Sequence, residues 1–262
     1  TTGDLGANIK AGNDDTTIVG GSGNDTLTGD MGDDSLEGNG GEDLILGATG
    51  DDFISGGTRN DTLDGGEGND TLMSGSDSNM MTGGTGTDQF IIQHNAGGTV
   101  ITDYETNNYA ERIDLTTISD LTSLSDLTFT TEGSDVRITG TGLDLLVQNT
   151  SASDFDASDF VFAGQDPLIF NISADATTEQ LQQIFNGAPP GATINLAAGT
   201  YVITDPIWIT RGDITIRGAG EDQTIFRTEI PDEKAGSTIL VQPEDVVHRF
   251  GSLGVEVVEG SN

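Results

Sequence analysis

An apolar residue recurs at every ninth position over the first third of the chain. The series never slips, and it consists of Ile18, Leu27, Leu36, Ile45, Ile54, Leu63, Leu72, Met81 and Phe90. From Gly20 onward the surrounding residues divide into nonapeptides of the form GGxGxDxUx, where U is the apolar residue, and a degenerate copy occupies residues 11–19. A short repeat sustained without slippage predicts a solenoid in which each copy stacks on its neighbours.

The spacing within the repeat predicts how the copies stack. Each nonapeptide offers a six-residue turn and then a three-residue strand whose middle side chain points inward and whose neighbours point outward. We expect two nonapeptides to complete one coil, so that equivalent turns stack every 18 residues. The sixth-position residues then fall into two columns, one with Asp25, Asp43, Asp61 and Asn79, the other with Thr16, Asp34, Asp52, Asp70 and Asp88.

The composition of the chain indicates that these acidic columns require cations. Asp and Glu total 44 against 9 Lys and Arg, which gives a formal net charge of −35, and cysteine is absent. Such a chain repels nucleic acid and anionic membranes, and it attracts cations. Carboxylates stacked one strand spacing apart repel each other by roughly 3 kcal/mol per pair at an effective dielectric near 20. The repeat therefore needs a cation between its turns.

Turn propensity alone would also enrich Asp and Gly, but it would not place Asp at the sixth position in seven of eight copies. Ca²⁺ suits a flexible cage of carboxylate and carbonyl oxygens better than Mg²⁺ does, so several calcium ions are expected. The predicted carboxylate ligands are Asp25, Asp34, Asp43, Asp52, Asp61, Asp70 and Asp88. Backbone carbonyls are expected from Gly21, Gly23, Gly32, Gly41, Gly50, Gly66 and Gly68. Weaker sites are expected where Thr16, Arg59 and Asn79 interrupt the pattern.

These nonapeptides resemble the RTX, or hemolysin-type, repeats of bacterial proteins that leave the cell by type I secretion. The resemblance covers residues 11–91. It implies a parallel β-roll, a chain that stays unfolded in the low-calcium cytosol, and folding around calcium outside the cell. A secreted or cell-surface location follows from the same resemblance.

The period changes after Phe90, where alternating runs predict strands around 90–93, 99–103, 113–115, 127–131, 136–138, 143–147 and 160–162. We expect them to form a small antiparallel cap on the open end of the roll. The residues Asp88-x-Phe90, 101–104, 113–115 and 160–162 resemble the R-modules of mannuronan C5-epimerases. That resemblance makes Asp103 and Asp114 weaker calcium candidates, with a purely structural role as the alternative.

A second module is predicted after a linker at 164–167. Thr177 and Gln180 form a capping box, apolar residues follow at helical spacing, and short β segments run from 193 to 241. This order resembles the start of a right-handed parallel β-helix of the pectate-lyase-like kind. The expected layout is a calcium β-roll at 1–92, a β-strand cap at 93–163, the linker, and the start of a β-helix at 168–262, in an all-β chain with one capping helix.

Three functions remain open at this point. The first is a calcium-binding RTX module that supports folding and stability of a secreted bacterial protein. The second is a fragment of a polysaccharide lyase or alginate epimerase, with an extracellular polysaccharide as partner. The third is an adhesin or surface-layer segment.

The two histidines stand in unrelated contexts, so the sequence nominates no catalytic or organic-cofactor residue. No apolar run reaches the ~20 residues of a membrane span. The chain opens inside repetitive sequence, and we expect it to be one piece of a larger protein.

Overall fold

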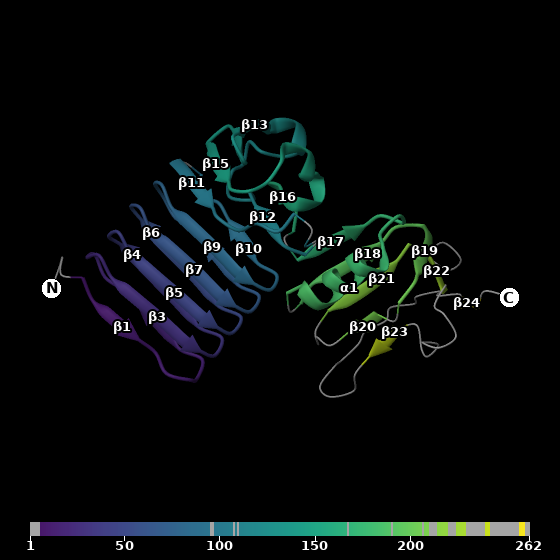
Figure 1. The fold of residues 1–262 in the computed structure, drawn as a ribbon, viewed down its shortest axis with the longest axis horizontal. Coiled ribbons are helices and arrows are strands. Elements are labelled where there is room, and N and C mark those ends of the chain that lie inside the picture. The colour runs from purple at the N-terminus through teal and green to yellow at the C-terminus, as the bar shows by residue number, and fades with distance from the viewer. Residues whose placement is uncertain are drawn as a thin grey trace. The chain divides into compact units, whose positions relative to one another are not determined.

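A computed structural model describes residues 6–94, 97–106, 108, 110–166, 168–189, 191–205, 207–209, 214–219, 224–228, 239–241 and 257–259. The chain divides into two units, residues 1–165 and 166–262, and the division lies within the predicted linker. Figure 1 shows the strands of the first unit stacked as successive coils. Among the described residues, no helix is long and apolar enough to cross a membrane.

The first unit is a β-roll with two sheets. One sheet has the order β1-β3-β5-β7-β9-β11-β15-β14-β13, and the other has the order β16-β12-β10-β8-β6-β4-β2. The parallel strands of the first sheet are β1 (Asn8–Lys10), β3 (Thr26–Met31), β5 (Leu44–Thr49), β7 (Thr62–Glu67), β9 (Met80–Thr85), β11 (Gly97–Ile101) and β15 (Leu143–Val147). Those of the second are β2 (Thr17–Val19), β4 (Ser35–Gly40), β6 (Phe53–Thr58), β8 (Thr71–Met73), β10 (Gln89–Ile91), β12 (Arg112–Asp114) and β16 (Phe160–Val161).

The register follows the sequence period. Leu27 pairs with Ile45 and Ile45 with Leu63, so each coil consists of two nonapeptides as predicted. Every apolar repeat residue from Leu27 to Phe90 is fully buried. Six of the strands run over six residues rather than the predicted three, because the first residues of the next nonapeptide also pair with the adjacent coil, as Asp30 does with Ala48.

The antiparallel part of the cap is smaller than the sequence pattern suggested. Among the described residues, the antiparallel pairs are β13 (Thr128–Glu132) with β14 (Asp135–Gly140) and β14 with β15. The strands β11, β12 and β16 instead continue the parallel sheets of the roll, because their inward residues stay in register with the repeat, as Ile113 does with Phe90. Three short 3-10 helices complete the cap at Leu124–Asp126, Ala152–Asp154 and Ala157–Asp159.

Aromatic side chains close the core beneath the cap. Ring centroids lie 5.7–6.1 Å apart along a cluster made of Phe90, Tyr104, Phe129, Phe155, Phe160 and Phe162. Phe90 is the last inward residue of the repeat, so this cluster continues the apolar column of the roll directly into the cap. These large aromatic rings cover the end of an apolar column that would otherwise be exposed to water.

The second unit is built from short parallel sheets and one helix. The sheets are β17-β18-β21, β19-β22-β24 and β20-β23. Helix α1 (Thr178–Gly187) begins at the predicted capping box, and it buries Leu181, Ile184 and Phe185. The strands are β17 (Ile169–Ile172), β18 (Thr193–Leu196), β19 (Gly199–Ile203), β20 (Ile207–Ile209), β21 (Thr215–Gly218), β22 (Thr224–Thr228), β23 (Ile239–Val241) and β24 (Val257–Glu259).

The apolar column makes a direct prediction for stability. Replacing Leu63 by Ala removes a fully buried side chain and should lower the free energy of unfolding by about 2–5 kcal/mol in saturating calcium, as measured by urea titration. Leu44→Ala is the matched control, because Leu44 is 39% exposed on the same sheet and its truncation should cost under about 1 kcal/mol. Equal losses for the two variants would contradict the inward column.

Candidate metal sites

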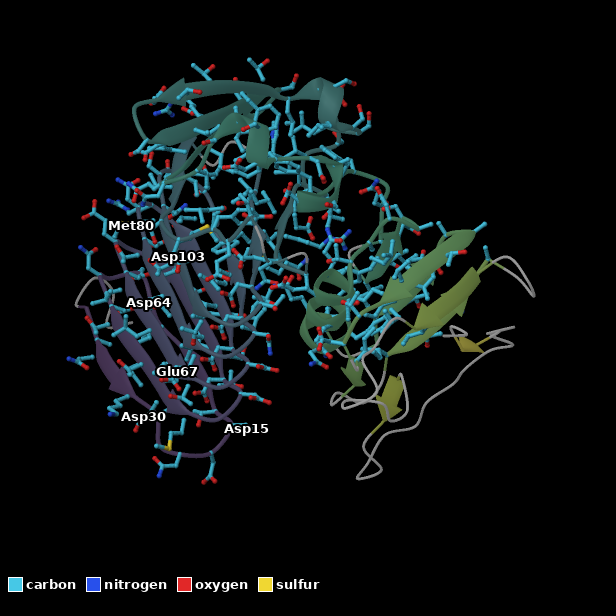
Figure 2. All side chains as sticks on the ribbon, turned by 45° about the vertical axis from the view of Figure 1, so that its right-hand side comes forward. Asp15, Asp30, Asp64, Glu67, Met80 and Asp103 are labelled. Atoms are coloured by element: carbon cyan, nitrogen blue, oxygen red, sulfur yellow. The ribbon has the colours of Figure 1, made fainter. Side chains whose placement is uncertain are left out.

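The sixth-position residues lie in the two columns that the repeat predicts. Each of the seven aspartates there is 1–3% exposed. Further carboxylates, including Asp15, Asp30, Asp64 and Glu67, lie along the roll outside these columns and are not buried (Figure 2). The columns are therefore the buried part of a strongly negative unit.

One carboxylate oxygen of each stacked aspartate is satisfied by the backbone. The amide of the residue 18 positions earlier donates to Oδ1, for example Asp34 to Asp52 at 2.8 Å and Asp52 to Asp70 at 2.8 Å. The other column repeats this bond from Asp25 to Asp43 at 2.7 Å. These bonds fix each carboxylate against the preceding coil and leave its second oxygen, Oδ2, pointing away from that backbone amide.

The second oxygen, Oδ2, has no hydrogen-bond donor within the described residues in five of these aspartates, and it is buried in Asp34, Asp43, Asp52, Asp61 and Asp70. In Asp25 it accepts a hydrogen bond from the Gly21 amide at 2.6 Å. A buried carboxylate oxygen without a donor is costly unless a cation or a proton compensates it.

Each of these oxygens faces a first-position glycine of its own repeat. A methyl group built on that glycine would lie 2.3–2.6 Å from Oδ2 and 2.5–3.0 Å from a backbone carbonyl of the next coil. We call this space, bounded by one Oδ2 and one carbonyl oxygen, a cradle. Six cradles occur, in front of Gly20, Gly29, Gly38, Gly47, Gly56 and Gly65, and their carbonyls belong to Gly38, Gly47, Gly56, Gly65, Ser74 and Gly83.

The donor set of a cradle fits calcium. Carboxylate and carbonyl oxygens are the ligands that Ca²⁺ prefers, and its contacts of 2.3–2.6 Å match the size of the space. No group of three or more acidic or histidine side chains is placed to hold a metal among the described residues. A cation in a cradle would therefore depend on backbone carbonyls as much as on side chains.

The cradle carbonyls differ from those predicted from the sequence. The carbonyls of Gly23, Gly32, Gly50 and Gly68 lie against the backbone of the glycine 18 residues later. The Gly66 carbonyl lies against Gly84, the Gly21 carbonyl accepts the Gly40 amide at 3.0 Å, and Gly41 adopts a positive φ in its turn. The cradle carbonyls stand at the first position of the repeat, whereas the carbonyls predicted from the sequence stand at its second and fourth positions, and both sets stay predictions as calcium ligands. The alternation of the strand would have revealed the first position, because it lies two residues after the apolar residue and so on the same inward side.

The weaker candidates have hydrogen-bond partners within the protein. Asp103 accepts the amides of Gly83 and Gly84 at 3.0 and 2.8 Å. Asp114 accepts the Thr116 amide at 2.8 Å and the Gln89 side chain at 3.0 Å. Both residues thus join the cap to the roll through neutral donors, and calcium binding by them stays a prediction.

Glu111 is a site residue that sequence reasoning missed. Arg112 pairs with Gln89, so Glu111 stands next to Asp88 in the column, and it is 3% exposed. Its Oε1 accepts the Glu105 amide at 3.0 Å, and burial raises its pKa to about 9. The signal was present in the sequence, because Glu111 precedes Ile113 by the same two positions that separate Asp88 from Phe90.

Burial controls the protonation of the columns. Desolvation is the main cause that raises the pKa of Asp52 to about 6, of Asp61 to about 7, of Asp70 to about 8 and of Asp88 to about 7, and neighbouring carboxylates add to the shift. Backbone hydrogen bonds oppose the shift without cancelling it. The pKa values of Asp34 and Asp43 are raised for the same reason.

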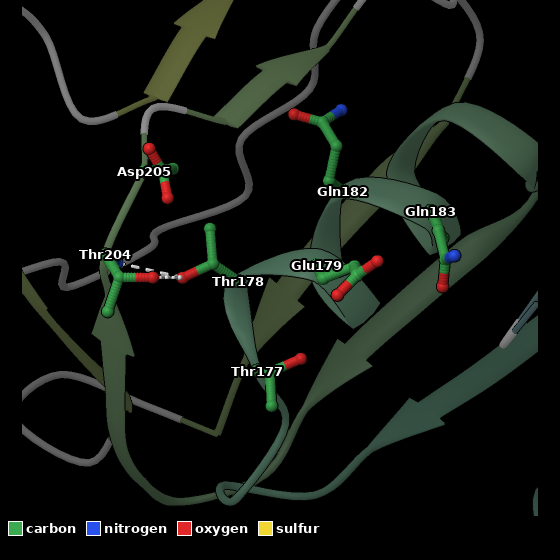
Figure 3. Close-up of a pocket in the computed structure, with 7 residues that line it drawn as sticks. All are labelled: Thr177, Thr178, Glu179, Gln182, Gln183, Thr204 and Asp205. Atoms are coloured by element: carbon green, nitrogen blue, oxygen red, sulfur yellow. Dashed lines mark hydrogen bonds between the residues drawn. The ribbon is translucent and has the colours of Figure 1, made fainter. Parts of the chain in front are cut away.

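The second unit contains an open hollow of about 520 Å³ beside the start of α1 (Figure 3). The residues that line it are polar in type, and the Oγ1 of Thr178 accepts the Thr204 amide at 2.9 Å. The described lining residues are Thr177, Thr178, Glu179, Gln182, Gln183, Thr204 and Asp205. They provide hydroxyl, amide and carboxylate groups, from which no nucleophile paired with a base can be assembled.

Comparison with known proteins agrees with this geometry. The family described as RTX calcium-binding nonapeptide repeat (4 copies) matches residues 11–45, 46–81 and 55–90. This part of the chain is an RTX calcium-binding repeat module, and such repeats are typical of secreted bacterial proteins. No curated protein matches the chain.

Two solved structures of mannuronan C5-epimerase subunits from Azotobacter vinelandii are similar to the chain. The AlgE6R2 subunit is 20% identical, with a TM-score of 0.35, over 55% of this chain and 91% of that one. The AlgE6R3 subunit is 22% identical, with a TM-score of 0.26, over 59% of this chain and 81% of that one.

Filling a single cradle tests the proposed position of the cation. Gly47→Ala would place a methyl group 2.3 Å from Asp52 Oδ2, so we expect native mass spectrometry to show one fewer bound calcium and urea titration to show about 1–3 kcal/mol lower stability. Gly12→Ala is the control, because a methyl group there meets nothing within 4 Å. Unchanged calcium binding in Gly47→Ala would contradict the cradle.

The raised pKa values predict an inverted pH dependence for the calcium-free chain. Protons bind these carboxylates more tightly in the folded roll than in the unfolded chain, where the pKa is near 3.8. Folding in chelator should therefore be most favourable below about pH 4 and should weaken as pH rises towards 8. Far-UV circular dichroism in chelator should show more β structure at pH 4.5 than at pH 8.5. The opposite trend would refute the assignment of buried, unpaired carboxylates.

Proposed function

We propose that this chain is the calcium-dependent folding module of a secreted bacterial protein, and that its roll folds and becomes stable when it meets extracellular calcium. The observation that carries the proposal is the unpaired Oδ2 that faces a backbone carbonyl in five of the six cradles. These two oxygens repel each other, and among the described residues no hydrogen-bond donor reaches this Oδ2. When bound, calcium would supply the positive charge that both oxygens lack.

Three kinds of residue would form the calcium sites, namely the column aspartates, the first-position glycines and the inward apolar residues. The Oδ1 atoms hold each carboxylate in place through backbone amides, as Asp43 does through Asp25. The first-position glycines leave the space open, since any side chain there would fill it. The apolar column holds the two edges of the roll at a constant separation. We propose Asp25, Asp34, Asp43, Asp52, Asp61, Asp70 and Asp88 as the carboxylate ligands.

This design suits a chain that crosses a membrane unfolded. In the cytosol, where calcium is scarce, buried carboxylates at neutral pH oppose the fold. Extracellular modules bind calcium in the range of about 10⁻⁴–10⁻³ M, so the same carboxylates favour the fold outside the cell. Ligand binding to the native state alone adds stability in proportion to the logarithm of the calcium concentration.

The proposed layout keeps the boundaries expected from the sequence, with the roll at 1–92, its cap at 93–163, and a second module at 168–262. For the second module we propose the start of a right-handed parallel β-helix. Three parallel sheets support this proposal, as does the stacking of Asn195 on Asn171, whose side chains are joined by a 3.0 Å hydrogen bond in adjacent strands. The buried face of α1 supports the role of a capping helix.

A calcium titration tests the proposal. The chelated chain at pH 7.5 should gain β structure by far-UV circular dichroism at submillimolar to millimolar calcium. Asp52→Asn should bind one calcium fewer and shift the midpoint to higher calcium. Asp51→Asn is the matched control, because it also removes one negative charge but stands at the fifth position, outside the cradles, where its Oδ1 accepts the backbone amide and the side-chain nitrogen of Asn69 at 2.8 and 3.0 Å. No response of the unaltered chain to calcium would refute the proposed function.

A further inference from the structure

One nonapeptide of the roll, residues 74–82, departs from the repeat at two positions at once. Its first position is Ser74 where seven other copies have glycine, and its sixth is Asn79 where they have aspartate. Its strand, β9, and its inward Met81 keep the regular register, and Met81 is fully buried. The two changes therefore concern the turn and leave the stacking of the coil intact.

The Asn79 side chain places an amide nitrogen, which is a hydrogen-bond donor, where five of the other copies have an unpaired oxygen. Its Oδ1 accepts the Asp61 amide at 2.8 Å, which is the same bond that each stacked aspartate makes. Because that amide can pair only with the oxygen, the nitrogen must occupy the position of Oδ2. It donates to the carbonyls of Ser76 and Asp77 at 3.1 and 3.2 Å.

The Ser74 side chain fills the space that first-position glycines leave open. Ser74 is fully buried, and its Oγ donates to the Gly75 carbonyl and accepts the Gln93 amide, both at 3.2 Å. In the other copies a single methyl group at this position would approach Oδ2 to 2.3–2.6 Å. The cradle of this copy is thus occupied by the protein, and both of its polar side chains are paired.

We infer that the turn at residues 74–79 closes without calcium, and that the ion column on its edge of the roll ends at the cradle formed by Asp61 Oδ2 and the Ser74 carbonyl. This inference rests on the proposed calcium function of the other turns. The column on the opposite edge has no such interruption, because Asp70 and Asp88 continue it into the same coil. In the coil next to the cap, the turn that contains Asp88 therefore depends on a metal ion. The turn at residues 74–79, on the other edge of the same coil, is held by hydrogen bonds within the protein.

The consequence is a gradient of calcium dependence along the chain. The coils between Gly20 and Asp61 rely on ions at both edges. The last coil relies on an ion at one edge, while its other edge is closed by an amide and its apolar residue Phe90 packs on Tyr104 of the cap. When calcium falls, the turn at 74–79 should retain its hydrogen bonds longest, since none of them depends on an ion.

Restoring the repeat tests the inference. The double variant Ser74→Gly/Asn79→Asp reopens the cradle and supplies the carboxylate, so native mass spectrometry should show one more bound calcium than in the unaltered chain. Asn60→Asp is the matched control, because it adds the same charge in the neighbouring turn, but at the fifth position, where Asn60 only accepts the Ser78 amide. It should leave the number of ions unchanged. An unchanged number in the double variant would overturn the inference.

A second pair of variants keeps the test decisive if the double variant fails to fold. Asn79→Ala should retain every calcium ion, whereas Asp70→Asn should lose one. Loss of an ion in Asn79→Ala would overturn the inference and leave the proposed function intact. An unaltered chain that binds no calcium would remove the proposed function itself, so the two failures are distinguishable.

Discussion

The regular coils of the roll bury aspartate carboxylates in their turns. One oxygen of such a carboxylate accepts a hydrogen bond from a backbone amide, and the other faces a backbone carbonyl. The energies involved explain why the rest of the fold depends on this arrangement. Burying one apolar side chain per nonapeptide contributes about 1.5–3 kcal/mol. Two stacked carboxylates repel by roughly 3 kcal/mol at an effective dielectric near 20. These quantities nearly cancel before the entropy of ordering the chain is considered. A roll with a single apolar residue per repeat therefore needs cations, and its glycine and aspartate positions are where they can enter.

The sequence predicted those parts of the molecule that follow from strict periodicity. The nine-residue interval identified the inward column from Leu27 to Phe90 and the seven buried aspartates. It did not identify the cradle carbonyls, because they depend on the strand continuing into the next nonapeptide, as the pairing of Asp30 with Ala48 shows. Glu111 was missed because an insertion breaks the period, although spatial stacking restores the register. Local sequence determines each turn, whereas the contacts between coils emerge only from the assembled roll.

Dependence on ions differs from place to place along the chain. The cap obtains its stability from a cluster of aromatic rings and from neutral hydrogen bonds such as those of Asp103. The turn at 74–79 replaces a cation with an amide. The second unit again relies on buried apolar residues, with Tyr201 fully buried and its hydroxyl donating to the Ile172 carbonyl at 3.0 Å. The proposed calcium dependence is thus concentrated in the regular repeats, each of which buries a single apolar residue.

The most direct test is to locate the ions. A crystal structure of the calcium-loaded chain, with anomalous diffraction data that identify calcium, would show whether ions lie between the coils. Our account predicts anomalous peaks about 2.3–2.6 Å from the Oδ2 atoms of Asp34, Asp43, Asp52, Asp61 and Asp70 and near the first-position carbonyls, with no peak between the side chains of Ser74 and Asn79. Peaks confined to the exposed carboxylates of the surface, with the buried Oδ2 atoms left uncoordinated, would contradict it.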